Sequence, residues 1–334
     1  MKHYIWGETV PGNSGRSKLE DMNIDYKAGA GKAGAKFVLG ILRYWTNLTL
    51  YKDMQSALDS HTYFASMEPG FSEKTYEDKP FVVPYLVEGS DTAVIVAPGG
   101  GYAFLGNVGD ESSFETVGMA RYLNEHGHNA FVLNYRYNPY KFPVPLLDMQ
   151  RAIRYVKFHA EEYGIDPSKV GIVGFSAGGY QVGGFLHLVQ GTNLLKKAYP
   201  DYETDAIDAV DDTVNNAGLL YPLTDFNWNK ACLYSTMNFN PSKDREAAKR
   251  ALEDYNLCLH LHDLQTPEFV AHGKKDMLIS YQSSIQYDEA LDRAGVPHEF
   301  YEIPDANHNF TPDTSAATAY VYDQYIAFLD EHMK

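Results

Sequence analysis

The sequence predicts an α/β fold in which a mostly parallel central sheet carries helices on both faces. From about residue 80 onward, short apolar runs typical of buried strands alternate with longer stretches typical of helices. Such alternation implies parallel pairing of strands through right-handed crossovers. A glycine-rich turn at 174–178 joins one buried strand directly to a helix, which supports the same interpretation. The chain has 334 residues, enough for one large α/β domain or two small ones.

Short segments rich in apolar residues have the composition of strands. The first of them contains Pro84, which cannot donate a ladder hydrogen bond, and is therefore expected at an edge of the sheet. The segments 92–97 and 170–173 are expected to be buried strands, and the others are expected to be strands. In chain order, the expected strands are 81–87, 92–97, 129–134, 170–173, 217–221, 268–272 and 299–303.

Helices are expected between these strands. Apolar residues recur in steps of three and four from Leu146 to Ala160, which predicts a helix with one apolar face. Gly295 is placed to end a later helix, because glycine readily adopts the left-handed conformation found there. The other expected helices lie near 114–125, after residue 177, near 280–294 and near 315–330.

Residues 1–75 are expected to form a helical N-terminal extension of the main domain, which occupies 76–334. In this extension Phe37, Ile41 and Trp45 recur at helical spacing. We interpret the pattern as a helix docked on the main domain or on a partner subunit. A lid over the active site or a helix on a membrane surface is the alternative.

A second departure from the regular alternation covers about 223–264. The stretch mixes aromatic residues such as Trp228 with the charged run Lys243-Asp244-Arg245-Glu246. We expect a small insertion above the strand ends, where ligands bind in open parallel sheets. The insertion would then shape the substrate pocket, and a surface excursion without a role in specificity is the alternative.

Composition limits the partners and the location of the protein. A formal net charge of −16 argues against binding to nucleic acid or to an anionic membrane. Cys232 and Cys258 are the two cysteines and do not make a disulfide framework. The N-terminal residues lack the apolar core of a signal peptide, and no apolar run reaches membrane-spanning length. These features predict a cytoplasmic protein; an oligomer of identical chains is left open.

The strand at 170–173 runs into Gly174-Phe175-Ser176-Ala177-Gly178. A serine on such a sharp strand-to-helix turn has a strained backbone and projects its hydroxyl from the edge of the sheet. Side chains at either glycine would collide with the neighbouring strand or helix. We therefore expect Ser176 to be a nucleophile at the N-terminus of a helix, where a developing oxyanion is stabilised.

A serine nucleophile needs a base and a carboxylate that orients the base. Asp276 follows the strand at 268–272 through a short loop, and His308 follows the strand at 299–303. Both positions are at the carboxyl ends of strands, where ligands bind in parallel sheets. We expect Ser176, Asp276 and His308 to form a catalytic triad.

Other candidates for this chemistry are weaker. Asp225 follows a neighbouring strand and is an alternative acid, whereas we expect His272 to pack locally in the loop that carries Asp276. His260 and His262 alternate as metal ligands can, but no clear third ligand lies nearby, so no metal and no cofactor is expected. The acidic cluster of Asp205, Asp208, Asp211 and Asp212 is interpreted as a solvated face.

A second glycine-rich stretch, Pro98-Gly99-Gly100-Gly101-Tyr102, directly follows the strand at 92–97. Glycines allow backbone N–H groups to approach a reacting carbonyl closely. We therefore assign the oxyanion hole to the N–H groups of Gly100, Gly101 and Ala177. Phosphate binding is the alternative use of such a loop, but the sequences that accompany it do not follow.

Together these motifs resemble the α/β-hydrolase superfamily. The stretches 98–102 and 174–179 are similar to the acetyl-esterase and acetylxylan-esterase-like branch, which is related to hormone-sensitive-lipase-type esterases. Tyr221-Pro222 and 307–310 also match in kind and place. Related lipase-type esterases usually have histidine where this chain has Pro98, but backbone donors are unaffected. The resemblance covers about residues 80–330 and implies an α/β-hydrolase fold.

The resemblance also implies a serine ester hydrolase, and some similar proteins remove acetyl groups from xylan or its oligosaccharides. We expect hydrolysis of short-chain acetyl esters, with an acetylated oligosaccharide or a similar small ester as substrate. A general short-chain carboxylesterase is one alternative, and a peptidase or amidase with the same triad is another. A non-catalytic hydrolase fold used for binding is a further alternative, although such proteins usually lose the serine or the histidine.

Overall fold

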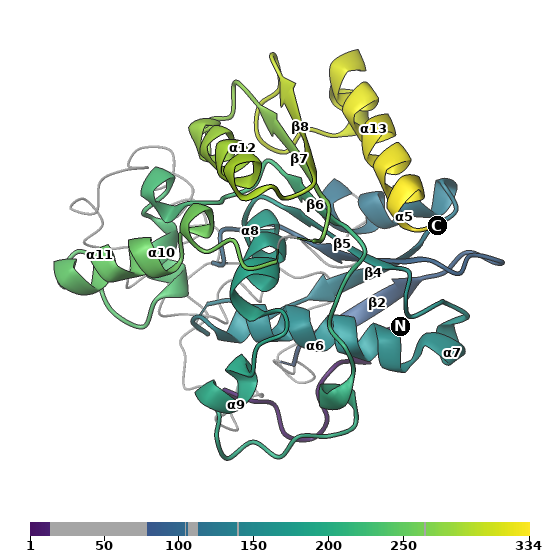
Figure 1. Ribbon diagram of the computed structural model, residues 1–334, viewed down its shortest axis with the longest axis horizontal. Coiled ribbons are helices and arrows are strands. Elements are labelled where there is room, and N and C mark those ends of the chain that lie inside the picture. The colour runs from purple at the N-terminus through teal and green to yellow at the C-terminus, as the bar shows by residue number, and fades with distance from the viewer. Residues whose placement is uncertain (14–78, 104, 106–112, 139, 264) are drawn as a thin grey trace, which may run out of the picture.

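A computed structural model describes residues 1–13, 79–103, 105, 113–138, 140–263 and 265–334. These residues contain one eight-stranded sheet, in the order β1-β2-β4-β3-β5-β6-β7-β8 (Figure 1). Strands β1 and β2 are antiparallel to their neighbours, and the rest of the sheet is parallel. The strands are β1 His3–Tyr4, β2 Phe81–Tyr85, β3 Ala93–Ala97, β4 Asn129–Asn134, β5 Val170–Phe175, β6 Ala217–Leu220, β7 Glu268–Gly273 and β8 His298–Ile303.

Helices cover both faces of this sheet, as the alternation in the sequence predicts. The helices are α5 Met119–Glu125, α6 Val144–Phe158, α7 Ala160–Tyr163, α8 Ala177–Gly184, α9 Leu194–Ala198, α10 Cys232–Thr236, α11 Arg245–Asp254, α12 Gln282–Ala294 and α13 Ala316–His332. Apolar residues of α6, α8 and α12 belong to one core cluster, and those of α5 and α13 belong to another.

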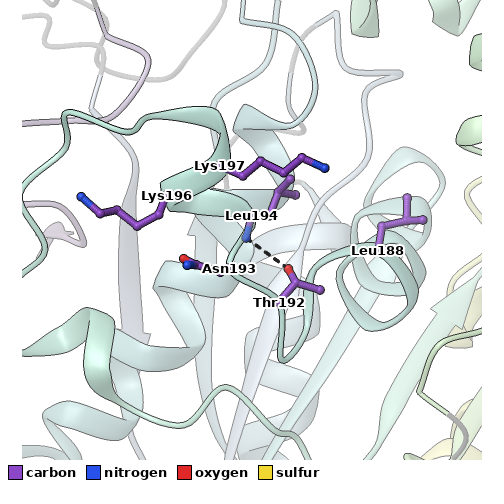
Figure 2. Close-up of a pocket in the computed structure, with 6 residues that line it drawn as sticks. All are labelled: Leu188, Thr192, Asn193, Leu194, Lys196 and Lys197. Carbon is purple, nitrogen blue, oxygen red and sulfur yellow. Dashed lines mark hydrogen bonds between the residues drawn. The ribbon is translucent and has the colours of Figure 1, made fainter.

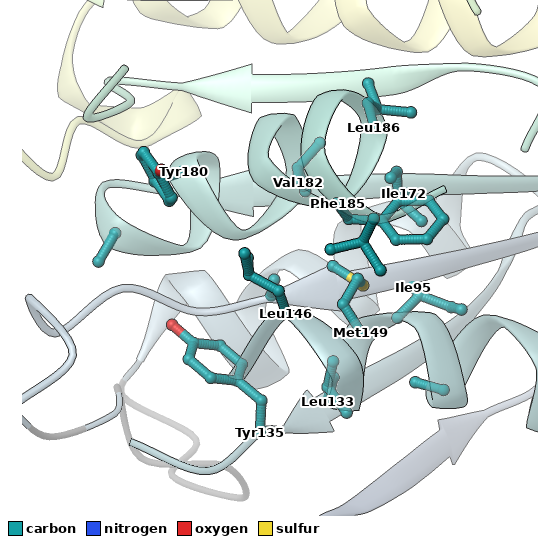
Figure 3. Packing of buried hydrophobic residues seen from close by; sticks show 14 of the residues in the cluster. Ile95, Leu133, Tyr135, Leu146, Met149, Ile172, Tyr180, Val182, Phe185 and Leu186 are labelled. Carbon is teal, nitrogen blue, oxygen red and sulfur yellow. The ribbon is translucent and has the colours of Figure 1, made fainter. Parts of the chain in front are cut away.

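Successive residues of a strand supply these two clusters in turn. In β3, Ile95 belongs to the first cluster, whereas Val94 and Val96 belong to the second. Figure 3 shows Ile95 and Ile172 of the sheet close to Met149 and the neighbouring helical side chains of the first cluster. A strand buried on both faces must be apolar throughout, which explains the continuous apolar runs in the sequence.

The strand that contains Pro84 is second in the sheet rather than outermost. Strand β1 pairs only with Phe81 and Val82 of β2, so Pro84 lies beyond the end of β1. The expectation of an edge strand is therefore wrong for the first half of β2. At Pro84 itself β4 is the only neighbour among the described strands, which is compatible with a missing N–H donor.

The first residues of the chain pack against the main domain, and the domain boundary expected at residue 75 stays a prediction. Ile5 and Trp6 are buried, and the Trp6 indole N–H donates to Asp148 Oδ1 at 2.8 Å. The Arg151 guanidinium lies 4.7 Å from the Trp6 ring and donates to the Ile5 carbonyl. The expected helix that contains Phe37, Ile41 and Trp45 lies outside the described residues.

The acidic cluster is a solvated face only in part: the side chains of Asp205 and Asp211 are exposed, as expected, whereas those of Asp208 and Asp212 are buried. The Arg151 side chain is buried, with ion pairs of 2.5 Å to Asp205 and 2.8 Å to Asp208. Asp212 is also buried and accepts a hydrogen bond from Gln150 at 2.6 Å. These carboxylates neutralise the cationic and polar groups of α6, a long-range pairing that the sequence does not reveal.

The stretch between β6 and β7 interrupts the regular alternation, as expected. It holds α10, α11 and two short 3₁₀ turns, Phe226–Trp228 and Leu257–Leu259. Every residue of α10 is buried, so this part of the insertion is packed against the domain rather than displayed on its surface. Among the residues that the structure describes, no helix has the length and apolar character needed to cross a membrane.

Candidate active site

Ser176 lies on the sharp turn between β5 and α8, with φ of 56° and ψ of −117°. A Cβ atom at Gly174 would lie 1.9 Å from the carbonyl oxygen of Gly178, and one at Gly178 would lie 2.0 Å from that of Ala97. No side chain fits in either place. The two glycines therefore permit the tight approach of strand and helix that forces Ser176 into its strained conformation.

The structure brings together the three residues that the sequence analysis places in a triad. His308 Nε2 lies 2.9 Å from Ser176 Oγ, and His308 Nδ1 lies 2.6 Å from Asp276 Oδ2. Asp276 and His308 follow β7 and β8 at the same edge of the sheet. The Asn307 side chain links their loops, because its oxygen accepts the Met277 N–H at 2.9 Å.

The Asp276 carboxylate has donors on both oxygens. Oδ1 accepts the backbone N–H groups of Leu278 and Ile279, each at 2.8 Å, and Oδ2 lies 3.0 Å from His272 Nε2 in addition to His308. Burial alone would raise the pKa of Asp276, but the hydrogen bonds from the two histidines hold it well below its usual range. The group is therefore an ionised acceptor that requires a proton on His308 Nδ1.

His272 has a more specific place than the local loop packing expected from the sequence. The side chain is fully buried, with Nδ1 2.7 Å from Ser284 Oγ and Nε2 on Asp276. Because an ionised carboxylate only accepts hydrogen bonds, His272 Nε2 carries a proton. His272, in β7, is thus a second hydrogen-bond donor to the Asp276 carboxylate, which lies four residues later in the loop after this strand.

The second glycine-rich loop has three consecutive residues with positive φ: 132° at Gly100, 62° at Gly101 and 58° at Tyr102. Several of its carbonyl groups are held in place. Tyr135 donates to the Pro98 carbonyl at 2.7 Å, and Ser235 of α10 donates to that of Gly101 at 2.6 Å. A fixed loop of this kind presents its remaining N–H groups in one orientation.

The N–H groups of Gly100, Gly101 and Ala177 have no hydrogen-bond partner within the part of the chain that the structure describes. Gly100 and Gly101 are partly exposed, and Ala177 is the first residue of α8. Free donors at a helix N-terminus and on a glycine-rich turn attract negative charge. Oxygen anions are the groups that such donors bind.

Glu115 also contacts this region, although no motif in the sequence indicates it. Its Oε2 accepts the Gly99 N–H at 2.8 Å, and its Oε1 accepts the Tyr221 O–H at 3.0 Å. The Tyr221 ring meets the His308 ring edge to face, with 4.8 Å between centroids. Only the tertiary contacts reveal this residue, because its partners lie 16 and 106 positions away in the chain.

The weaker candidates have other roles. Asp225 Oδ1 accepts the Asn227 N–H at 2.8 Å and caps the turn Phe226–Trp228. His260 Nε2 lies 2.9 Å from the Glu253 carbonyl oxygen. Across the described residues, no group of three or more His, Cys, Asp or Glu side chains is placed to hold a metal ion.

A surface pocket on α9 lies apart from these residues. Figure 2 shows its lining, in which the Leu194 N–H donates to Thr192 Oγ1 at 3.3 Å. The lining residues are Leu188, Thr192, Asn193, Leu194, Lys196 and Lys197. Ser176 precedes the first turn of α8, whereas Leu188 belongs to the turn that follows this helix. The pocket is therefore at the far end of the helix from the nucleophile.

The chain is similar to one family model and to several curated proteins. The family model described as BD-FAE matches residues 82–291, which include Ser176 and Asp276. An acetylxylan esterase of Xylanibacter ruminicola is 27% identical over 238 residues, 70% of this chain and 44% of that protein. The chain spans about half the length or less of the curated relatives that it matches.

Two solved structures are similar over most of their length. One is an acetyl ester-xyloside bifunctional hydrolase from Caldicellulosiruptor lactoaceticus, with a TM-score of 0.64, 28% identity, and coverage of 80% of this chain and 92% of the other. The second is MGS-M1, an α/β-hydrolase enzyme from a deep-sea metagenome library of the Medee basin. It has a TM-score of 0.52 and 22% identity, and the match covers 76% of this chain and 93% of the other.

Proposed function

The chain belongs to the BD-FAE family and has the α/β-hydrolase fold, and on this basis we propose that it is a serine ester hydrolase acting on short-chain, chiefly acetyl, esters. One observation carries the proposal. The hydrogen-bonded series Ser176–His308–Asp276 lies next to the glycine-rich loop and the start of α8, where the N–H groups of Gly100, Gly101 and Ala177 have no partner among the described residues; acyl transfer requires this arrangement.

In the proposed acylation step, His308 Nε2 accepts the proton of Ser176 as Oγ attacks the ester carbonyl carbon. Asp276 keeps the other ring proton on Nδ1 and stabilises the imidazolium that forms. The N–H groups of Gly100, Gly101 and Ala177 donate to the oxyanion of the tetrahedral intermediate. His308 then protonates the leaving alcohol, and the acyl group stays on Ser176.

In the proposed deacylation step, water takes the place of the alcohol. His308 accepts a proton from the water as its oxygen attacks the acyl carbonyl, and the same N–H groups hold the second oxyanion. Collapse of this intermediate returns the proton to Ser176 Oγ and releases the carboxylic acid.

We propose acetylated xylo-oligosaccharides or similar acetylated sugars as substrates. Two relatives support this choice, since one is an acetylxylan esterase and the other an acetyl ester-xyloside hydrolase. The insertion carries Asn227 and Trp228, and the Trp228 indole donates to Gln286 of α12 at 2.8 Å, which fixes the ring. Polar groups beside a fixed aromatic ring suit a sugar better than a fatty chain.

Hydrolysis of p-nitrophenyl acetate by wild-type protein and by Ser176→Ala tests the function. We expect the substitution to lower turnover roughly a millionfold, the loss seen when a triad nucleophile is removed. Circular dichroism of both proteins provides the control for folding. A folded Ser176→Ala variant within tenfold of wild type would refute the assignment. Release of acetate from acetylated xylo-oligosaccharides, compared with cleavage of a p-nitroanilide, distinguishes the esterase from an amidase.

A further inference from the structure

Glu115 joins two parts of the proposed active site through the two oxygens of one carboxylate. It lies in the π-helical turn Phe114–Gly118, which leads into α5. Its partners, the Gly99 N–H and the Tyr221 O–H, are both donors. An ionised carboxylate offers two acceptor oxygens and no donor, so Glu115 suits this pair of partners better than an amide or a hydroxyl.

The contact with Gly99 holds the loop that presents the oxyanion donors. The peptide group between Pro98 and Gly99 is bound on both sides, by the Tyr135 hydroxyl at its carbonyl and by Glu115 at its N–H. A Cβ atom at Gly99 would lie 2.9 Å from Glu115 Oε2 and 2.9 Å from Ser176 Cβ. The carboxylate, the loop and the nucleophile are therefore packed together, and rotation of this peptide would move the next N–H groups relative to Ser176.

The contact with Tyr221 fixes a ring that packs against His308. Tyr221 is fully buried and has φ of 40°, an unusual value for a residue with a side chain. Its ring lies 4.8 Å from that of His308 and 4.9 Å from that of Phe310. Burial raises the pKa of Tyr221 well above its usual range, so the phenol stays protonated and donates to Glu115.

We propose that Glu115 is a positioning residue that fixes the oxyanion donors and the Tyr221–His308 pair relative to each other. The inference rests on the proposed esterase function. A negative charge this close to the oxyanion opposes the transition state, so the useful property of Glu115 is the reach of its two oxygens rather than its charge. Shape and charge therefore have opposite effects on the reaction and are separable by substitution.

Two substitutions of Glu115 distinguish the effect of its shape from the effect of its charge. Glu115→Gln removes the charge and keeps the length; its amide oxygen can accept the Gly99 N–H while its NH₂ group donates to the Tyr221 oxygen. Glu115→Asp keeps the charge but is one methylene shorter, so it cannot reach both partners. Glu125→Ala, at an exposed carboxylate of α5, is the matched control.

The measurements are kcat and KM for p-nitrophenyl acetate and Ki for a trifluoromethyl ketone, which binds serine esterases as a tetrahedral adduct. We expect Glu115→Asp to lower kcat about 30-fold and to raise Ki by a similar factor, since loss of a single oxyanion donor costs about 100-fold or more. KM should change less than about threefold. Glu115→Gln should stay within about fivefold of wild type, and the control should be unchanged. A general loss of packing would not raise Ki in proportion to the fall in kcat.

The order of activity among the wild type, Glu115→Gln and Glu115→Asp tests the proposal. Full activity in both variants would show that Glu115 does not position the loop, and a greater loss in Glu115→Gln than in Glu115→Asp would show that charge matters instead. Either result overturns the proposal. A wild-type protein without esterase activity would remove the proposed function as well as this inference, whereas an active wild type with the wrong ranking removes the inference alone.

Discussion

Replacement of Asp276 by asparagine should disable the proposed triad while leaving most of the local structure in place. Asp276 accepts hydrogen bonds from Leu278 and Ile279 on one oxygen, and from His272 and His308 on the other. Asparagine has a single acceptor oxygen. If that oxygen stays with the two backbone N–H groups, the NH₂ group points at the two histidines. His308 must then accept at Nδ1 and carry its proton on Nε2, which faces Ser176.

In that tautomer His308 cannot accept the serine proton, and we expect kcat to fall about ten-thousandfold, or about 5.5 kcal/mol of transition-state stabilisation. His272 also loses its acceptor, at a cost of about 1–3 kcal/mol in the free energy of unfolding. Assays with p-nitrophenyl acetate measure the loss of kcat, and thermal unfolding measures the loss of stability.

Asp225→Asn is the matched control for this experiment. Asp225 Oδ1 accepts hydrogen bonds from the backbone N–H and the side-chain NH₂ of Asn227, and an asparagine at position 225 can keep its oxygen in that place. Activity of this variant should stay within about threefold of wild type. The reasoning fails if Asp276→Asn loses less than about 100-fold, or if Asp225→Asn loses more than Asp276→Asn.

Two further predictions concern acyl length and pH. A series of p-nitrophenyl esters should give the highest kcat/KM for the acetyl or propionyl ester and a lower value for the octanoyl ester. Each methylene buried in an apolar pocket adds about 0.8 kcal/mol to the binding free energy. A maximum of kcat/KM at eight carbons or beyond would therefore indicate a long apolar acyl pocket and contradict the prediction. The folded-state pKa of Asp276 is depressed, so its ionised form stabilises the fold above the unfolded carboxyl pKa of about 4, and this stability is lost as pH falls toward the folded value. The difference in Tm between wild type and Asp276→Asn should therefore narrow below about pH 4, and a constant difference down to pH 3 would contradict the cause assigned to the shift.

The sequence predicts the parts of this molecule that depend on local patterns. Buried parallel strands need continuous apolar runs, and Ser176 directly follows one of them. Asp276 and His308 each follow a strand within a short loop. The strained turn at Ser176 needs glycines on both sides, so its signature is local as well. For these reasons the order of the strands along the chain and the grouping of the three side chains are predictable from the sequence.

Other features depend on residues that are distant in the chain and could not be predicted. Strand β1 has two residues, too few to produce a pattern, and the next residues, Ile5 and Trp6, are held by side chains about 140 positions later. Glu115 has no motif, and its position on Gly99 and Tyr221 follows from the packing of the turn before α5. The ion pairs of Asp205 and Asp208 with Arg151 are not visible in the sequence, because Arg151 is more than 50 positions away.

The attachment of residues 3–6 has a consequence for the order of folding. Trp6 and Ile5 bind Asp148 and Arg151, which lie 142 and 146 positions later. At a synthesis rate of about 5–20 residues per second, these partners are made roughly 7 to 30 seconds after the strand itself. Closing so long a loop adds an entropic cost that the contacts with α6 help to offset. Until α6 has been made, Ile5 and Trp6 lack these partners and Trp6 stays exposed, so the docking of residues 5–6 is expected to follow the synthesis of α6.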